Sequence, residues 1–351
     1  MKPAQLANQS SSWFGAEGPG WDIVISSRVR LARNLADYEF LPCLTPARQQ
    51  EILDRLSGAI LSLSLGDEVC FMDVDRAATL ERQLLTERHL ISRQHAAGKG
   101  PRGVVISAKE SFTAMINEED HLRMQVYAAG FNLWDCWKRI NAIDDMIEQK
   151  VRYAYSERWG YLTACPTNVG TGIRVSVMLH LPALKMTGQI EKFITAAKDA
   201  DLAVRGLFGE GTDALGDFYQ LSNQVTLGVR EEDVVRELSE AIVPRIVDYE
   251  KAARQVLLEQ KPHTLDDKIQ RALGVLKSAC LISTQEALYL LSSVRLGGNL
   301  GRVPNLSLAT INELFLLTQP AHLQLRAGKM LDADQRDALR AQIIRQKLAN
   351  N

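Results

Sequence analysis

The sequence predicts an α+β protein, in which a sheet-containing domain over residues 1–255 precedes an all-helical domain over residues 256–351. Two observations lead to this prediction. Before residue 230, short segments of alternating apolar and polar residues are interleaved with amphipathic helical patterns. After Pro262 the alternation stops, and apolar residues recur at helical spacing. The length of 351 residues suits two domains, or one large domain with an appendage.

The composition is that of an ordinary globular protein, with 46% hydrophobic and 24% charged residues. The net charge of -1 creates no overall field that attracts nucleic acid or an anionic membrane, and we expect neither partner. The five cysteines lack CxxC spacing, which argues against disulfides or a thiolate zinc site. The six histidines lack HExxH spacing, so we expect no metal ligands from protein side chains. Without a secretory signal or a membrane-length apolar segment, the chain is predicted to be cytoplasmic.

The first strand is expected over residues 22–31, after an irregular segment over residues 1–20 that is rich in Gly, Ser and Pro. Strand periodicity places Arg28 and Arg30 side by side on one face. The other face of this strand is expected to carry Ile25, Val29 and Leu31. An arginine pair of this kind, taken by itself, is typical of a solvated strand face.

Three strands in a meander form the middle of the predicted sheet, and the third alternates well. If the extended conformation reaches back from this strand, Glu119 lies on the face of Arg123, and Glu118 lies on the opposite face. Such an acidic run is more often a simple turn. The other elements expected before residue 165 are a helix over 45–63, a strand over 69–74, one helix over 76–93, the strands 103–107, 112–117 and 121–127, and a helix over 131–151.

The segment from Cys165 to Arg174 joins a thiol, two loop glycines and an arginine within ten residues. The alternation from Ile173 to Leu181 predicts a strand in which Arg174 points away from the core-facing side. A lone cysteine is more often buried and structural than functional. The remaining predicted elements are a helix over 187–200, strands over 202–208 and 218–228, a helix over 231–260, and the helices 265–279, 283–294, 306–317 and 334–348.

Five arginines from separate segments, namely Arg28, Arg30, Arg123, Arg174 and Arg205, share the predicted non-core faces and loops with Glu119, Glu210 and Cys165. In a nearly neutral protein, arginines directed toward one sheet face indicate an anionic ligand there. Planar guanidinium groups bind phosphate oxygens in pairs. Several of them suit a triphosphate with its Mg²⁺, where catalysis consists of positioning and charge neutralisation.

These segments carry a family resemblance. Residues 26–30, 117–123, 165–174 and 205–210 resemble, in order, motifs of the phosphagen (guanidino) kinases, such as arginine and creatine kinase. The resemblance implies a glutamine-synthetase-like catalytic domain, with an antiparallel sheet flanked by helices. It also implies an ATP site. The residues that it assigns to ATP are Ser26, Ser27, Arg28, Val29, Arg30, His89, Arg123, Arg174, Val175, Ser176, Val177, Met178, Arg205, Gly206, Leu207, Phe208, Gly209 and Glu210.

The chemistry of this family explains its acidic residues. A guanidinium is a poor nucleophile because it is protonated and its lone pairs are delocalised. Two carboxylates, by resemblance Glu119 and Glu210, orient the planar group and take up its proton. Whether either carboxylate removes the proton or mainly aligns the group stays open. The resemblance gives Cys165 the role of a thiolate that acts electrostatically and by positioning, not as a covalent nucleophile.

Two departures point to one branch of the family. First, only 25 residues precede Ser26, whereas phosphagen kinases have a helical N-terminal domain there that closes over a small substrate. Second, the helical region after residue 256 has no counterpart in the phosphagen kinases. Both features, and the Arg336–Ala341 motif, resemble the bacterial protein arginine kinases. On a helix Arg336 and Arg340 lie one turn apart beside Asp337. The resemblance implies allosteric phosphoarginine binding by Arg336, Asp337, Arg340 and Ala341.

This branch implies transfer of the ATP γ-phosphoryl group to protein arginine side chains. It also implies a role in stress response and protein quality control, in which a heat-shock repressor is inactivated and marked proteins pass to a Clp-type AAA+ ATPase. A zinc-containing activator protein and a homodimer are further expectations. Two alternatives stay open at this point: a kinase of free arginine or a related small molecule, and a non-catalytic phosphoarginine reader.

Overall fold

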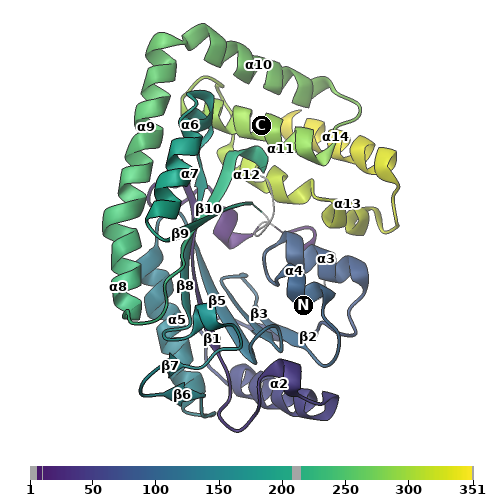
Figure 1. Cartoon of the computed structure of the whole chain (residues 1–351). Coiled ribbons are helices and arrows are strands. Elements are labelled where there is room, and N and C mark those ends of the chain that lie inside the picture. Colours follow the sequence, from purple (N-terminus) through teal and green to yellow (C-terminus); the bar gives the residue numbers. More distant parts are fainter. Residues whose placement is uncertain (1–5, 10, 208–214, 350–351) are drawn as a thin grey trace.

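The computed structural model describes residues 6–9, 11–207 and 215–349. These residues form one eight-stranded antiparallel sheet, a small two-stranded hairpin and helices around both (Figure 1). The order of strands in the sheet is β2-β3-β4-β5-β1-β8-β10-β9. The strands are β1 (Val24–Arg33), β2 (Val69–Asp73), β3 (Gly103–Ser107), β4 (Phe112–Ile116), β5 (Leu122–Ala129), β8 (Ile173–His180), β9 (Leu202–Gly206) and β10 (Phe218–Asn223), and the hairpin is β6 (Tyr155–Ser156) with β7 (Gly160–Tyr161).

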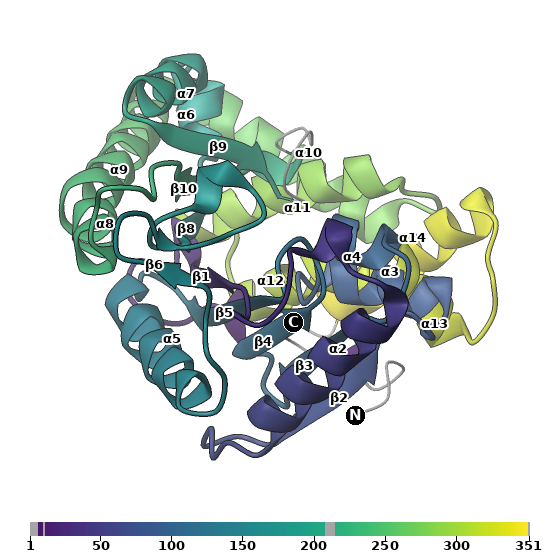
Figure 2. The same ribbon diagram turned by 60° about the horizontal axis from the view of Figure 1, so that its bottom comes forward.

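One face of the sheet is covered by helices and forms the main hydrophobic core. Val29 and Leu31 of β1 and Val175 of β8 point into it, as the alternation predicted. Figures 1 and 2 show α5 and α2 across the lower part of this face and α8 and α9 along its side. The helices of this layer are α2 (Pro46–Leu61), α5 (Leu133–Glu148), α6 (Pro182–Met186), α7 (Ile190–Asp199), α8 (Glu231–Arg236) and α9 (Val243–Gln260).

The opposite face is divided between two further groups of helices. The helices after residue 261 pack against its upper part, where Ile25, Met178 and Phe218 join their core. The short helices α3 and α4 pack against β3 and β4 together with α13. These helices are α3 (Thr79–Glu87), α4 (Arg93–Ala97), α10 (Pro262–Ser278), α11 (Thr284–Asn299), α12 (Leu308–Leu317), α13 (Pro320–Ala327) and α14 (Ala333–Ala349). No helix among the described residues is long and apolar enough to cross a membrane.

Several details differ from the prediction. The single helix expected over residues 76–93 ends at Glu87, because His89 adopts a left-handed φ of 58° that an α-helix does not accommodate. A register shift after Val24 turns Ile25 onto the other face from Val29. Within the irregular N-terminal segment, Trp13 and Phe14 form a buried helical turn. The sequence patterns also missed three short helices, α4, α6 and α13, and the hairpin of β6 and β7.

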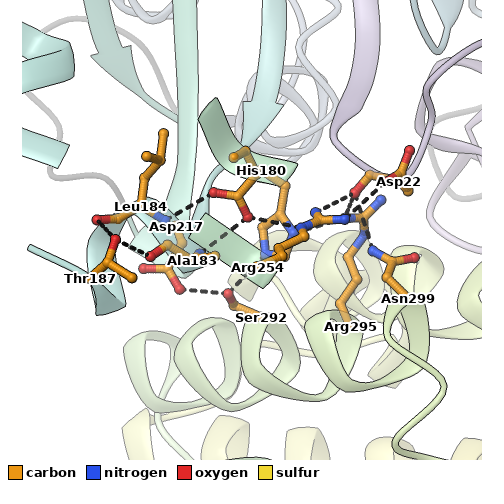
Figure 3. Close-up of polar contacts among 11 residues, drawn as sticks. Asp22, His180, Ala183, Leu184, Thr187, Asp217, Arg254, Ser292, Arg295 and Asn299 are labelled. Carbon is orange, nitrogen blue, oxygen red and sulfur yellow. Dashed lines mark hydrogen bonds and ion pairs between the residues drawn. The ribbon is translucent and has the colours of Figure 1, made fainter. Parts of the chain in front are cut away.

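A buried polar network joins the sheet to the helices that follow residue 261 (Figure 3). Ser292 of α11 donates to Asp217 at 2.6 Å and lies 2.9 Å from Nε2 of His180. Arg295, one turn along α11, contacts Nδ1 of His180 at 2.8 Å and donates to the carbonyl of Asp22. The predicted boundary at residue 255 falls inside α9, and the chain turns only at Lys261. The two regions therefore share a buried, hydrogen-bonded contact.

Candidate active site

The predicted arginines converge on a cleft with a volume of about 620 Å³ in the sheet face that the main core leaves uncovered. Antiparallel pairing places Arg30 of β1 directly opposite Arg174 of β8. On the other side of β1, Arg123 of β5 lies opposite Ala32, which is two residues after Arg30. Arg205 enters from β9, and Arg28 lies two residues before Arg30. All five line the cleft: Arg28, Arg30, Arg123, Arg174 and Arg205. The sequence-based prediction that these segments meet is confirmed.

Arg30 is electrostatically uncompensated in this arrangement. Its Nε atom is buried without a hydrogen-bond partner among the described residues. Burial lowers the pKa of Arg30 well below its ordinary value, and the positive charges of Arg28, Arg123 and Arg174 lower it further. Like charges directly opposite each other destabilise a sheet, and a buried charge is costly without a counterion. The cleft is therefore built to receive a polyanion, and the phosphates of a nucleotide fit its donor set.

The inner end of the cleft is held by Arg28, Tyr127 and His89. Arg28 donates to the hydroxyls of Ser176 and Tyr127, both at 3.1 Å. The Tyr127 hydroxyl in turn donates to the carbonyl of His89 at 2.8 Å, which fixes the left-handed residue in place. Burial, and to a lesser extent Arg28, lowers the pKa of His89 to about 3, so His89 is neutral. A neutral ring beside Arg28 adds no repulsion to the cluster.

A small recess adjoins this end, and Trp13 forms one of its walls. Trp13 stacks on Tyr127 with ring centroids 5.4 Å apart and meets the edge of His89 at 5.2 Å. Ser26, Ser176 and Met178 also line the recess, and their assignment to ATP stays a prediction. Trp13 was missed because it lies in a segment whose composition predicted irregular structure. Trp13 and Tyr127 are both buried, so this aromatic pair forms part of the packed inner wall beside Arg28.

The acidic side of the cleft differs from the prediction. Asn117 adopts a left-handed φ of 59°, so the extended conformation does not reach back through residues 117–121. As a result both carboxylates face Arg123, with Glu118 at 2.7 Å and Glu119 at 3.2 Å. The expectation that Glu118 points to the opposite face is wrong. Both acids line the cleft.

Glu118 is a functional candidate that the sequence pattern missed. Its side chain is fully buried, and it accepts hydrogen bonds from Arg123, the backbone amide of Glu119 and the hydroxyl of Ser92. Burial acts to raise the pKa of Glu118, but Arg123 and these hydrogen bonds outweigh it and hold the pKa below its usual value. Glu118 is therefore ionised, and it fixes both Arg123 and the backbone of Glu119. Only the turn geometry at Asn117 reveals this role.

Cys165 begins a loop at the rim of the cleft. The loop makes one 3-10 turn over Pro166–Asn168, and the Sγ atom of Cys165 lies 3.0 Å from the Thr167 hydroxyl. Asp120 accepts a hydrogen bond from the amide of Ala164, which ties this loop to the acidic turn. Cys165 is partly exposed and lines the cleft, unlike the buried Cys136. The structure therefore favours the functional interpretation of this cysteine over the buried, structural one.

Several of the other residues that the resemblance assigned to ATP do not line the cleft. Val29, Val175 and Val177 direct their side chains into the core, and Ser27 is fully buried with its hydroxyl donating to the Gly130 carbonyl. Gly206 ends β9 and Leu207 follows it as a buried residue. Three assigned residues, Phe208, Gly209 and Glu210, lie outside the described residues. The cleft has further lining residues that no pattern indicated, among them Ser92, Arg93, Gln94, Gln220 and Gln224.

The C-terminal motif lies on α14, and none of its residues lines this cleft. Arg340 is buried, and its guanidinium donates to the carbonyls of Thr318 and Ile282, the hydroxyl of Thr284 and the carboxylate of Asp337. Arg336 is half-buried and donates to the carbonyl of Leu331. Ala341 is buried in the helical core. Arg340 thus has a packing role in this structure, and binding of phosphoarginine by the motif stays a prediction.

Comparison with known proteins identifies the protein family of the chain. A family model described as the ATP:guanido phosphotransferase C-terminal catalytic domain matches residues 51–253, and one described as the protein-arginine kinase McsB C-terminal domain matches residues 262–351. The crystal structure of lombricine kinase is 27% identical, with a TM-score of 0.58 over 71% of this chain and 70% of that chain. The chain belongs to the ATP:guanido phosphotransferases, or phosphagen kinases, and the predicted fold class is confirmed.

Two bacterial relatives narrow this class further. A protein-arginine kinase of Brevibacillus brevis is 44% identical over 346 residues, which are 98% of this chain and 96% of the relative. A protein-arginine kinase of Desulforamulus reducens is 43% identical over 346 residues, which are 98% and 97% of the two chains. The chain belongs to the protein-arginine kinase branch of this family, as its motifs indicated, and it is a phosphotransferase.

Proposed function

We propose that the protein transfers the γ-phosphoryl group of ATP, bound with Mg²⁺, to arginine side chains of protein substrates. The observation that supports this most is the cluster around Arg30, whose partly buried like charges favour a bound polyanion, in the same cleft as Glu118, Glu119 and Cys165. An arginine-lined phosphate site beside carboxylates suits a cationic acceptor. The names of the relatives that match the chain over nearly its whole length support the same choice of acceptor.

In the proposed reaction, bound Mg-ATP supplies the γ-phosphoryl group, and a P–N bond to the acceptor guanidinium replaces a P–O bond. Arg28, Arg30 and Arg174 neutralise the charge of the transferred group. Glu119 orients the acceptor guanidinium by hydrogen bonds and takes up its proton. Glu118, fully paired, holds the Arg123 and Glu119 pair in place. Cys165 contributes negative charge beside a guanidinium nitrogen that does not attack.

The test uses ATP with a labelled γ-phosphate, an arginine-rich unfolded protein and, separately, free arginine, with products mapped at neutral pH. We expect label on protein arginines, lost in Glu119→Gln and Cys165→Ala. Cys280→Ala, which removes an exposed thiol elsewhere, is the matched control and keeps activity. Label on free arginine alone would make the protein a small-molecule phosphagen kinase. Absence of label on both acceptors would contradict the catalytic proposal and favour a phosphoarginine reader.

The same proposal extends to the cellular role. Phosphoarginine on a protein is a charge-reversed mark that a Clp-type AAA+ ATPase can select, and a phosphorylated heat-shock repressor loses cationic contacts to nucleic acid. We place this role in the cytoplasm. The proposal also includes a zinc-containing activator protein, a homodimeric state and allosteric binding of phosphoarginine at the Arg336 motif. A pull-down of arginine-phosphorylated proteins with an inactive Clp ATPase, before and after deletion of this kinase, tests it. Equal capture in both strains would contradict it.

A further inference from the structure

Large apolar side chains are exposed on two segments whose backbones are joined through one loop. Tyr155 is 60% exposed, Trp159 44%, Val225 45%, Leu227 46% and Val229 37%. The first two belong to the hairpin of β6 and β7, and the other three belong to the connection from β10 to α8. We call these five residues the apolar shelf. Exposed apolar residues of this size are common singly, but a group from two neighbouring segments indicates an interaction surface.

The two segments of the shelf are joined through the glycine of the cysteine loop. The amide of Tyr161 donates to the carbonyl of Gly170 at 2.7 Å, and the amide of Thr171 donates to the carbonyl of Thr226 at 3.0 Å. Gly170 has a φ of 109°, and a Cβ atom there would lie 2.4 Å from the Thr226 carbonyl oxygen. The three backbones therefore lie side by side, and only glycine permits this approach.

The shelf is also continuous with the cleft. Gln224 lines the cleft and directly precedes Val225 of the shelf. Thr226, buried between two shelf residues, donates its hydroxyl to the carbonyls of Thr167 and Val169 in the cysteine loop. Thr167, with Cys165, lines the cleft. A chain that places one side chain beside Cys165 therefore has the shelf directly next to it.

We propose that the apolar shelf binds the polypeptide on either side of the target arginine, and that its partner is an unfolded segment with apolar side chains near that arginine. This proposal rests on the proposed function and names its substrate class. Folded proteins bury their apolar side chains, so a surface arginine of a folded protein offers the shelf little to contact. An unfolded chain offers both the arginine and its apolar neighbours, because successive residues are only about 3.3 Å apart in extended backbone.

The chemistry of the shelf fits such a partner. Tyrosine and tryptophan give large contact areas at a small loss of conformational entropy and tolerate different partners. The guanidinium of Arg158 lies 4.6 Å from the centre of the Trp159 ring, which steadies that ring in its exposed position. The remaining shelf residues are aliphatic and have no hydrogen-bonding requirement of their own. Selection would therefore follow apolar character near the arginine and not a fixed sequence.

The test compares two acceptors in the full-length enzyme: reduced, carboxymethylated lysozyme as an unfolded protein, and a blocked Gly-Gly-Arg-Gly-Gly peptide with no apolar neighbours. The variants are Tyr155→Ser with Trp159→Ser on the hairpin, and Leu227→Ser on the other segment. We expect kcat/KM for the unfolded protein to fall about tenfold relative to kcat/KM for the peptide, mainly through KM. Tyr249→Ser on α9 removes a 62% exposed tyrosine elsewhere and is the matched control.

Each outcome decides the proposal. An unchanged ratio between the two acceptors in every shelf variant would overturn it. A loss of activity toward both acceptors, together with a smaller species in sedimentation, would show that the shelf binds a second copy of the chain, which also overturns it. Circular dichroism verifies that each variant is folded. If the hairpin variant does not fold, the Leu227→Ser variant alone provides the test. If the wild-type enzyme labels neither acceptor, the proposed function itself fails, which is a distinct result.

Discussion

The Nδ1 atom of His322 lies 2.8 Å from a carboxylate oxygen of Glu87, and this pair joins α13 to the end of α3. The carboxylate of Glu87 also accepts hydrogen bonds from the backbone amides of Ala321 and His322, at the start of α13. Its neighbour Arg88 contacts the other nitrogen of the same ring at 3.3 Å. His89 follows directly and lines the cleft. The C-terminal helices therefore contact a segment that positions the predicted nucleotide site.

Glu87→Gln tests whether this contact matters for nucleotide binding. Glutamine keeps the size of the side chain but supplies one acceptor oxygen in place of two, so a buried donor of α13 is left unpaired. We expect the free energy of unfolding to fall by about 1–3 kcal/mol and ATP to bind more weakly. Urea unfolding and ATP titration measure the two effects, with the exposed Glu51→Gln as control. Lower stability with unaltered ATP affinity would mean that the contact is structural only.

Buried neutral histidines should make the protein sensitive to acid. Burial lowers the pKa of His95 and of His121 to about 4. The unfolded chain binds protons near pH 6.5 while the folded chain does not. Stability is therefore retained above pH 6.5 and lost as the pH falls toward 4, by about 1.4 kcal/mol per pH unit for each such group.

His95→Gln isolates one of these groups. Glutamine can still donate to the Gly103 carbonyl, which the Nε2 atom of His95 contacts at 3.1 Å. Between pH 6.5 and 4 we expect the slope of unfolding free energy against pH to become shallower by about 1.4 kcal/mol per unit. His263→Gln, at an exposed position of α10, should leave the slope unchanged. Parallel curves for wild type and His95→Gln from urea titrations would refute the explanation.

Arg30→Met should separate stability from function. Methionine fills much of the same space without charge, which removes the repulsion from Arg174 directly opposite. We expect the nucleotide-free protein to gain up to about 1 kcal/mol in unfolding free energy. Phosphoryl transfer should fall by roughly 10³-fold or more. Thermal unfolding with and without ATP measures the change in stability, and an activity assay measures the loss of phosphoryl transfer. Arg55→Met, at an exposed ion pair, is the control. A less stable variant would show that Arg30 is a structural residue.

The two arginines of the C-terminal motif should behave differently. Arg340→Met removes a buried guanidinium and leaves the carbonyls of Thr318 and Ile282 and the Asp337 carboxylate without their donor. We expect a loss of about 3–5 kcal/mol in unfolding free energy. Arg336→Met loses one carbonyl contact and should cost about 1 kcal/mol. Calorimetry of phosphoarginine binding is therefore informative in the Arg336 variant. Equal stability of both variants would contradict the packing role of Arg340.

Alternation was a reliable guide in β8 and in β1 from Arg28 onward, so the face assignment for Arg28, Arg30 and Arg174 was correct. The pairing of Arg30 with Arg174 could not be derived from alternation, because it depends on contacts between residues 144 positions apart. Only the family motifs linked these segments beforehand. Local periodicity says which side of a strand a residue faces, but not which other strand lies beside it.

Two of the errors arise at single residues with positive φ. His89 ends a helix that its composition favoured, and Asn117 turns Glu118 toward Arg123. Neither residue is a glycine, and the strain is tolerated because surrounding hydrogen bonds fix the backbone. Arg340 is a different case, because helical spacing placed it one turn from Arg336 but could not reveal that its guanidinium is buried. Its burial depends on carbonyls from two other helix ends.

Burial protects several of this protein's own arginines from phosphorylation by another copy of the enzyme. Arg33, Arg88, Arg295 and Arg340 are each at most 1% exposed, and each guanidinium is engaged by several acceptors within the fold. A phosphoryl group has no room to reach these nitrogens, and a phosphate placed on one of them would break the contacts that hold the chain together. A catalyst that modifies arginine thus keeps the arginines on which its stability depends beyond the reach of a second copy of itself. Only unfolding would expose them, so the folded enzyme is a poor substrate at these sites.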